Sequence, residues 1–188
     1  MFGAGFYDIR PDLITIAKGL TSAYAPLSGS IVSEKVWKVL EEGSDRIGVI
    51  GHGWTYSAHP LCAAAGVANL TVLDKEALVA NAAEVGPYLS RALSEALAGR
   101  PHVGEVRGAG MLVAVELVKD RDGPVFFEPA AKAAFRVVEA MARRGVIARA
   151  MPQSDIIGFA PPLCLSRQEA DTIVAATSAA IDEIAPTL

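Results

Sequence analysis

The first third of the chain alternates short apolar runs with polar breaks, a pattern typical of buried strands joined to helices. Residues 13–17 (Leu-Ile-Thr-Ile-Ala) are apolar and β-branched and predict a strand buried on both faces. Residues 27–32 and 48–50 predict two more strands. Ser33 is expected to cap a helix that covers at least residues 34–40. These elements indicate part of a parallel α/β sheet.

The rest of the chain changes from helical spacing to alternating strands and helices. Residues 60–98 are rich in alanine at helical spacing, and we expect this helix to bend or break near 74–75 and 86–87. A Ser-Arg-Gln-Glu capping box at 166–169 is expected to open the last helix. Strands are expected at 103–107, 111–118, 146–150 and 156–159, and helices at 129–145 and 168–184. The pattern predicts a compact α+β unit.

These patterns divide the chain into two parts. Residues 1–72 predict part of a larger α/β domain, and residues 73–188 predict a long linking helix followed by an α+β domain. Three strands before residue 60 cannot close a doubly wound sheet, so its edges would be exposed without further polypeptide. We therefore expect a C-terminal fragment, a truncated reading frame or one piece of a longer chain.

Composition narrows the class of partner. The 188 residues are 52% hydrophobic with a mean hydropathy of +0.34, which excludes a disordered chain. The net charge of -4 provides no basic field to attract nucleic acid. The longest uncharged stretch, residues 47–73, contains a proline, two histidines and several glycines, which makes it a poor membrane span. We expect neither nucleic acid nor membrane as a partner. The mean hydropathy is high for a soluble chain, and we interpret the additional apolar residues as part of a buried interface.

The cysteines and histidines indicate neither a disulfide framework nor a metal site. Cys62 and Cys164 are far apart and flanked by apolar residues, and the first residues lack the features of an export signal. A cytoplasmic location is therefore expected. His52, His59 and His102 are not arranged at metal-ligand spacing, so no metal is expected.

Lys18 is the first candidate for chemistry. It follows the predicted strand and precedes Gly19, at the sheet edge where ligands bind in open α/β folds. Burial favours the neutral amine that forms a Schiff base with a carbonyl group. From the pattern alone, a lysine that extends into solvent at the end of the strand is an equally good interpretation.

A glycine-flanked polar loop at residues 51–59 is the second candidate. It runs into a helix whose first turn holds Pro60, and it can place the Thr55 hydroxyl and free backbone N–H groups around a phosphate. An ordinary connection, with Ser57 or His59 as the helix cap, would use the same residues. The loop by itself does not decide between the two interpretations.

Arg149 is a charged residue within the apolar strand predicted at 146–150. Its guanidinium could bind a substrate carboxylate through two hydrogen bonds. A solvent-facing arginine is the other interpretation, and the alternation along the strand does not exclude it. The Gly-Ala-Gly segment at 108–110 lacks the strand-to-helix context of a dinucleotide loop and predicts a hairpin turn.

Five segments, taken in order, resemble the class III pyridoxal-phosphate aminotransferases. They are Pro-Asp-Leu-Ile-Thr-Ile-Ala-Lys-Gly-Leu at 11–20, Pro-Leu-Ser-Gly at 26–29, Thr-Tyr-Ser-Ala-His-Pro at 55–60, Val-Arg-Gly-Ala-Gly-Met at 106–111 and Ala-Pro-Pro-Leu at 160–163. The first and third segments are the most specific. The resemblance implies an α/β fold: the C-terminal part of the large domain of a fold-type I PLP transferase over 1–72, and an α+β C-terminal small domain within 73–188.

The resemblance also implies roles for single residues. Lys18 would form the Schiff base with pyridoxal 5'-phosphate and move a proton between the substrate Cα and the cofactor. Thr55, with Trp54 beside it, would bind the cofactor, and in this family the phosphate usually belongs to the neighbouring subunit of a homodimer. Arg149 matches the carboxylate-binding arginine of the ω-amino acid and amine:pyruvate branch. Acetylornithine-type members instead carry an arginine at the positions that are residues 158–160 here.

The implied activity is the transfer of an amino group from an amino acid or amine to a 2-oxo acid such as pyruvate. An aminomutase or racemase of the same family is an alternative, since it shares the lysine. A catalytically silent association module is an alternative of another class. Full-length members have a Gly-rich phosphate loop, a ring-stacking aromatic residue and an aspartate that pairs with the pyridinium nitrogen, and none of these can be assigned in the 188 residues.

Overall fold

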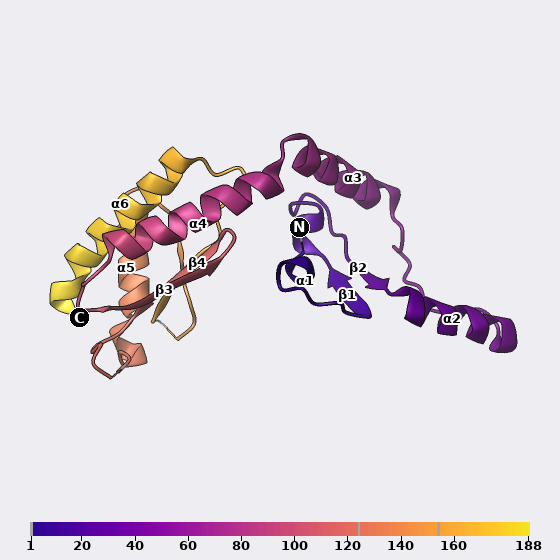
Figure 1. Cartoon of the computed structure of the whole chain (residues 1–188), viewed down its shortest axis with the longest axis horizontal. Coiled ribbons are helices and arrows are strands. Elements are labelled where there is room, and N and C mark those ends of the chain that lie inside the picture. The colour runs from indigo at the N-terminus through magenta and orange to yellow at the C-terminus, as the bar shows by residue number, and fades with distance from the viewer. Residues whose placement is uncertain (1, 124, 154) are drawn as a thin grey trace. The chain divides into compact units, whose positions relative to one another are not determined.

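The computed structural model describes residues 2–123, 125–153 and 155–188 (Figure 1). Its internal contacts divide the chain into two compact units, Met1–Ala77 and Leu78–Leu188. None of the described helices is long and apolar enough to cross a membrane. The boundary predicted at residues 72–73 concerns the domains of the complete fold and stays a prediction.

The first unit is built around a small antiparallel sheet. Its described elements are α1 (Gly3–Phe6), β1 (Leu13–Ile16), the 3-10 turn η1 (Lys18–Leu20), β2 (Gly29–Val32), α2 (Glu34–Ile47) and α3 (Pro60–Lys75). In the β1–β2 pair Leu13 lies opposite Val32 and Ile16 opposite Gly29, so the prediction of a parallel sheet is wrong for these strands. Parallel neighbours are usually joined by a crossover helix, whereas the connection at residues 17–28 contains only the short η1 and no helix that could return the chain to the start of the sheet.

Two further expectations for the first unit are wrong. Leu13 of β1 is 61% exposed while Ile14 is half-buried, so the strand is not buried on both faces. The sheet has only two strands, and the neighbouring elements of this unit do not provide enough apolar surface to cover both of its faces. Residues 48–50 form no strand: α2 ends at Ile47, Gly48 follows it with a φ of 87°, and Val49 is 89% exposed without a neighbouring strand to pair with.

Two predicted helix starts are confirmed by their hydrogen bonds. Ser33 Oγ accepts from Val36 N at 3.4 Å and opens α2. At the start of α6 (Arg167–Ile184), Ser166 Oγ accepts from Glu169 N at 3.2 Å, and Glu169 Oε2 accepts from Ser166 N at 2.8 Å. The N–H and hydroxyl of Ser166 hold the pKa of the Glu169 carboxyl below its ordinary value.

The second unit is an α+β arrangement with one sheet and helices against it. Its described elements are α4 (Leu78–Ala96), β3 (Val103–Ala109), β4 (Leu112–Leu117), η2 (Pro129–Ala131), α5 (Ala133–Ala142), β5 (Arg149–Ala150), β6 (Ile156–Phe159), α6 and η3 (Ala185–Thr187). The sheet is antiparallel with the order β3-β4-β6-β5. The strand predicted at 146–150 is shorter than expected, since only its last two residues pair with β6.

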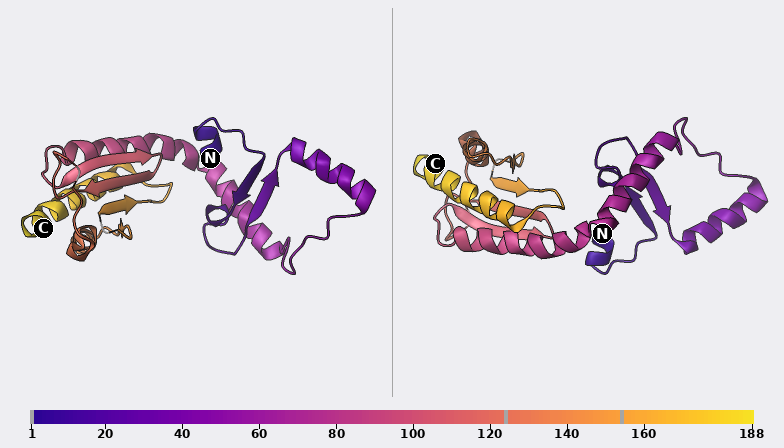
Figure 2. Two further views of the ribbon diagram at one scale, coloured as in Figure 1. Left: turned by 90° about the horizontal axis from the view of Figure 1, so that it is seen from below. Right: turned by 90° about the horizontal axis from the view of Figure 1, so that it is seen from above.

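The helices of the second unit pack on one face of this sheet (Figure 2). On β4, Val113, Val115 and Leu117 are buried, while the residues between them are only half-buried. These three side chains belong to the same apolar core as Leu89 and Leu93 of α4. Because buried and half-buried residues alternate along β4, the face of the sheet opposite the helices is less buried.

The interruption predicted near 86–87 is not a helix end, because α4 continues with Pro87 inside it. Gly86 lies against the turn between β3 and β4, and a Cβ at this position would overlap the carbonyl group of Gly110. Glycine is therefore required here by the close approach of two backbones. The other predicted break, at 74–75, coincides with the observed end of α3.

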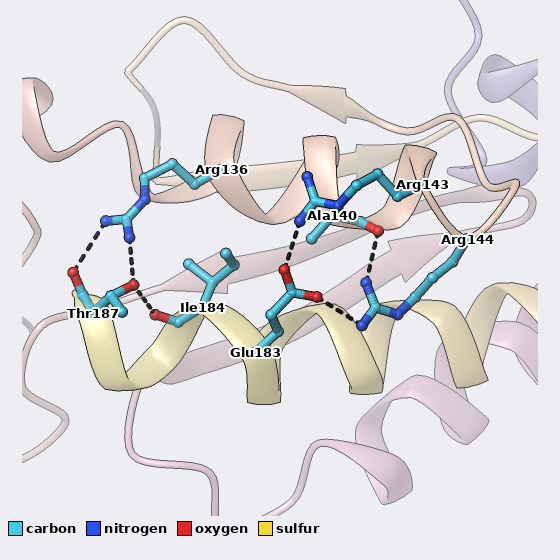
Figure 3. A network of polar contacts seen from close by, with 7 residues as sticks. All are labelled: Arg136, Ala140, Arg143, Arg144, Glu183, Ile184 and Thr187. Atoms are coloured by element: carbon cyan, nitrogen blue, oxygen red, sulfur yellow. Dashed lines mark hydrogen bonds and ion pairs between the residues drawn. The ribbon is translucent and has the colours of Figure 1, made fainter.

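A polar network joins α5 to the end of α6 (Figure 3). Glu183 accepts from Arg143 Nη2 at 2.5 Å and from Arg144 Nη2 at 2.7 Å. Arg136 Nη1 donates to the Thr187 carbonyl at 3.1 Å. These contacts fix the C-terminal helix on the helix that precedes β5.

Candidate functional site

Lys18 is the first residue of η1 and follows the extended residue Ala17 at the end of β1. Its φ of 51° lies in the left-handed region, which residues with a Cβ adopt at a cost. The side chain is exposed in this chain, as in the second of the two interpretations that the sequence pattern left open. β1 itself is only half covered, which leaves the amine accessible. No carboxylate in the described ranges forms an ion pair with it.

The turn that follows Lys18 is fixed on α3. Asn69 Nδ2 donates to the carbonyl oxygens of Gly19 at 2.9 Å and Leu20 at 3.2 Å. Ser22 Oγ donates to Asn69 Oδ1 at 2.7 Å. The sequence pattern gave no reason to select Asn69, because nothing local distinguishes this asparagine within its alanine-rich helix.

Thr55 lies in a turn within the loop 51–59 that precedes α3. Trp54 N donates to Ser57 Oγ at 3.0 Å, and Ser57 N donates to Trp54 O at 2.9 Å, which closes the turn around Thr55 and Tyr56. The Thr55 hydroxyl and the N–H groups of Thr55 and Tyr56 have no hydrogen-bond partner in the part of the chain that the structure describes. The Trp54 side chain is 69% exposed. The turn therefore presents three free donors.

The helix-cap interpretation of this loop is not supported by its hydrogen bonds. His59 is the N-cap of α3 by position, but its side chain makes no capping bond, and Ser57 Oγ accepts from Trp54 N instead. The buried His59 Nδ1 has no partner among the described residues. The N–H groups in the first turn of α3 are consequently not used by a side-chain cap, and this helix end can support an anion beside the Thr55 turn.

Arg149 belongs to the second unit, on the two-residue strand β5 at an edge of the sheet. Its side chain is exposed, and none of the ion pairs in the described ranges involves it. The predicted hairpin is confirmed, but its turn is shifted: Gly108 and Ala109 are the last residues of β3, and Gly110, at a φ of 56°, connects with Met111 to β4.

The donors found at these positions fit a phosphorylated aldehyde cofactor. A primary amine, such as that of Lys18, forms a carbon–nitrogen bond with an aldehyde. The hydroxyl and N–H groups around Thr55 are suited to a phosphate. Among the residues described, no three His, Cys, Asp or Glu side chains are grouped so that they could hold a metal ion.

Three comparisons relate the chain to known proteins. The family model described as aminotransferase class-III matches residues 1–181. A diaminobutyrate–2-oxoglutarate transaminase of Halomonas elongata is 53% identical over 187 residues, which cover 100% of this chain and 40% of the relative. A putrescine–pyruvate aminotransferase of Pseudomonas aeruginosa is 37% identical over 185 residues, which cover 98% and 39%.

The fold matches solved transaminase structures as well. One structure, from work on the directed evolution of transaminases by ancestral reconstruction, superposes with a TM-score of 0.96 at 56% identity. The match covers 100% of this chain and 41% of that one. The chain therefore spans about 40% of the length of the relatives that it matches.

Proposed function

The chain belongs to the class III aminotransferases, and on this basis we propose that the protein carrying it transfers an amino group from an amino acid or amine to a 2-oxo acid. The cofactor of this family is pyridoxal phosphate. When bound, it supplies an aldehyde and an electron-withdrawing ring that stabilises negative charge at the substrate Cα. The observation that carries the proposal is the accessible amine of Lys18 at the end of β1, within the segment that the family model matches.

Lys18 is the residue that would hold the cofactor covalently. Its amine would then take up and return a proton at the substrate Cα, which requires a neutral amine close to that carbon. In the described chain the side chain is exposed, so the dry surroundings that favour a neutral amine would come from further polypeptide packed over β1.

Thr55 and Trp54 would bind the cofactor through the turn before α3. The free Thr55 hydroxyl and the neighbouring N–H groups would donate hydrogen bonds to the phosphate, supported by the N-terminus of α3. We assign Trp54 to the same turn because its backbone closes the turn, and its exposed indole donates from Nε1 to His52 Nε2 at 3.4 Å within the same loop.

Arg149 would bind the carboxylate of the 2-oxo acid. A free guanidinium on a strand end can form two parallel hydrogen bonds with a carboxylate. Pyruvate and 2-oxoglutarate, the acceptors in the names of the two relatives, both carry a carboxylate beside the reacting carbonyl. We propose a 2-oxo acid such as pyruvate as the acceptor, as in the amine:pyruvate branch.

The protein is proposed to act as a homodimer. Large apolar side chains are exposed from α2 to α3, namely Trp37, Val39, Ile47, Val49, Ile50, Trp54, Tyr56, Leu61 and Val67. A soluble monomer rarely exposes so many together, and a second copy that covers residues 47–73 would bury those from Ile47 to Val67. In the complete fold, the first unit would belong to the large domain and the second would form the small domain.

The cellular location is a separate proposal. The free cysteines support a cytoplasmic location.

The test of this function uses the full-length polypeptide that carries these residues, loaded with pyridoxal phosphate. With an amino donor and pyruvate, alanine should accumulate, and Lys18→Ala should abolish it. Borohydride reduction and peptide mapping should place the cofactor on the peptide that contains Lys18. Lys35→Ala is the matched control, because Lys35 pairs with Asp12 on the surface and should leave turnover intact.

Other outcomes separate the alternatives. An isomerised donor without amino transfer to the acceptor would indicate an aminomutase or racemase. A label on another lysine, namely Lys35, Lys38, Lys75, Lys119 or Lys132, would overturn the assignment of Lys18. A folded protein with neither label nor turnover would indicate an association module.

A further inference from the structure

We propose that Asn69 is a positioning residue for Lys18. The inference rests on the proposed function, since it concerns how the amine of Lys18 is held in the orientation that the reaction requires. Asn69 touches neither substrate nor cofactor in this proposal. It acts through the turn that carries the lysine.

The contacts of Asn69 use its whole amide. Both of its bonds from Nδ2 reach main-chain carbonyls, those of the two residues that follow Lys18, at 2.9 and 3.2 Å. Its oxygen accepts from Ser22 Oγ at 2.7 Å. The Asn69 side chain therefore bonds to three residues, Gly19, Leu20 and Ser22, of a turn that lies about fifty residues earlier in the sequence.

This turn needs an external restraint because its backbone is unfavourable. Lys18, Ser22 and Ala23 all have φ between 48° and 63°, the left-handed region that favours glycine. Such conformations persist only where surrounding contacts fix them. If the turn relaxed, the direction of the Lys18 Cα–Cβ bond would change, and with it the position of the amine.

A second contact on the same face of α3 shows that the turn is seated on the helix. Gly66 lies three residues before Asn69, and the place of a Cβ there is 3.9 Å from Leu20 O and Thr21 Cγ2 of the turn and 3.0 Å from Leu27 Cδ2. Thr21, in the middle of the turn, is buried and donates from Oγ1 to Ala25 O at 2.6 Å. Gly66 allows the turn to approach, and Asn69 fixes its register on the helix.

The test compares Asn69→Asp with Thr71→Ala in the full-length holoenzyme. Aspartate keeps the shape of asparagine but loses both donors and places a carboxylate against two carbonyl oxygens. The control residue lies on the same helix, and its hydroxyl bonds only to Val67 O within that helix. We expect kcat of Asn69→Asp to fall about ten- to a hundredfold with KM for the donor within about twofold, because the substrate site is intact while the amine is displaced. Thr71→Ala should leave both unchanged.

Hydrogen exchange in the cofactor-free protein provides a readout besides activity. In Asn69→Asp the amides of residues 18–25, which include the bonds of Thr21 N to Lys18 O and Tyr24 N to Thr21 O, should exchange about tenfold faster. Exchange in the second unit should not change. Asn69→Gln, which retains both donors on a longer side chain, should restore part of kcat.

Each outcome decides the inference. Unchanged kcat in Asn69→Asp would overturn it whether or not exchange changes, and so would faster exchange throughout both units, which would mean a merely structural role. If Asn69→Asp does not fold, Ser22→Ala, which removes one bond to Asn69, should still speed exchange of residues 18–25, and no change there would also overturn the inference. The proposed function fails in a different way, through an unaltered protein that shows no borohydride label on Lys18.

Discussion

Arg149 on β5 and Gly158 on β6 lie directly opposite each other in the small sheet. On the next strand Ala114 lies opposite Gly158, so the two residues beside the arginine in this row have little or no side chain. Met151 approaches from the same strand end, with its Sδ 3.4 Å from the place of a Cβ on Gly158. The row next to the free guanidinium is therefore lined by small residues and by the Met151 side chain.

Arg107 occupies the other end of the same row and provides a contrast. It lies opposite Ala114, but its Nη1 donates to Glu105 at 2.7 Å and to Glu116 at 2.9 Å. Its charge is thus used within the sheet, whereas the charge of Arg149 has no such partner in the described residues. The difference in pairing indicates which arginine is available to a carboxylate.

Removal of the Arg149 guanidinium should affect only one half of the reaction. Arg149→Ala deletes charge-assisted contacts worth about 1.5 to 3 kcal/mol per hydrogen bond, so kcat/KM for pyruvate should fall about ten- to a few-hundredfold. The half-reaction of an amine donor without a carboxylate should be nearly unaffected. Single-turnover kinetics of each half-reaction would measure this difference.

Arg107→Ala is the matched control for this prediction. It removes a guanidinium from the same sheet row and should lower stability without changing the preference between the two half-reactions. Equal slowing of both half-reactions in Arg149→Ala, or no slowing of either, would mean that Arg149 is a structural or surface residue.

Local signals in the sequence were sufficient for some elements and insufficient for others. The Ser166 capping box and the hairpin around residues 108–110 were predicted because each depends on a few neighbouring residues. The strand at 48–50 and the parallel sheet were wrong because strand pairing depends on residues far away in the sequence. An apolar run without a partner strand remains irregular.

Among the residues of the candidate site, those with a local sequence pattern were also predicted, and those that depend on distant contacts were not. Lys18, Thr55 and Arg149 were selected from short patterns around each residue, and the family match covers all three. Asn69 was missed because its significance comes from hydrogen bonds to a turn about fifty residues earlier. The short pattern around Lys18 left both a buried and an exposed side chain open, since its exposure depends on how much polypeptide covers β1.

Loss of the Thr55 hydroxyl should weaken cofactor binding. Thr55→Val keeps the shape of the side chain but removes one donor to the phosphate, so the Kd for pyridoxal phosphate should rise about ten- to a hundredfold. Thr55→Ser should bind nearly as well as the unaltered protein, and Thr71→Val should have no effect because that hydroxyl bonds only within α3. Fluorescence or absorbance titration of the cofactor-free protein would measure these values.

Mixed dimers would show which subunit's cofactor Thr55 serves. If Thr55 reaches the neighbouring site, co-expression of Lys18→Ala with Thr55→Val subunits creates heterodimers with one unaltered site and one doubly altered site. Activity at limiting cofactor should then exceed that of either variant alone. If Thr55 serves its own subunit, every site carries one defect and no activity is regained.

The close approach at Gly86 should make this position intolerant of any side chain. A Cβ there overlaps the Gly110 carbonyl and lies 3.0 Å from Met111 N, so the backbone of the β3–β4 turn would have to move. We expect Gly86→Ala to lower the free energy of unfolding by about 1 to 3 kcal/mol. Gly43→Ala in α2 adds the same methyl where nothing lies within 4 Å and should stabilise by about 0.5 to 1 kcal/mol. Denaturant unfolding of both variants would test the contrast.

The contribution of Glu183 to stability should depend on pH. Its hydrogen bonds with Arg144 and Arg143 hold the pKa of the carboxyl below its ordinary value of 4.5. A pKa that is lower in the folded than in the unfolded state means that the stabilisation is complete above about pH 4.5 and is lost as the pH falls through the folded value. Glu183→Gln should therefore lower Tm at pH 7, and the difference in Tm should shrink progressively below pH 4.5. Salt at 1 M should also reduce the difference in Tm between Glu183→Gln and the unaltered protein, because both guanidinium groups are partly exposed.

Glu95→Gln in α4 is the control, since Glu95 takes part in none of the ion pairs of the described chain and its small effect should not vary with pH. A Tm difference for Glu183→Gln that stays constant from pH 7 to pH 3 would show that the network in Figure 3 does not act through the charge of this carboxyl.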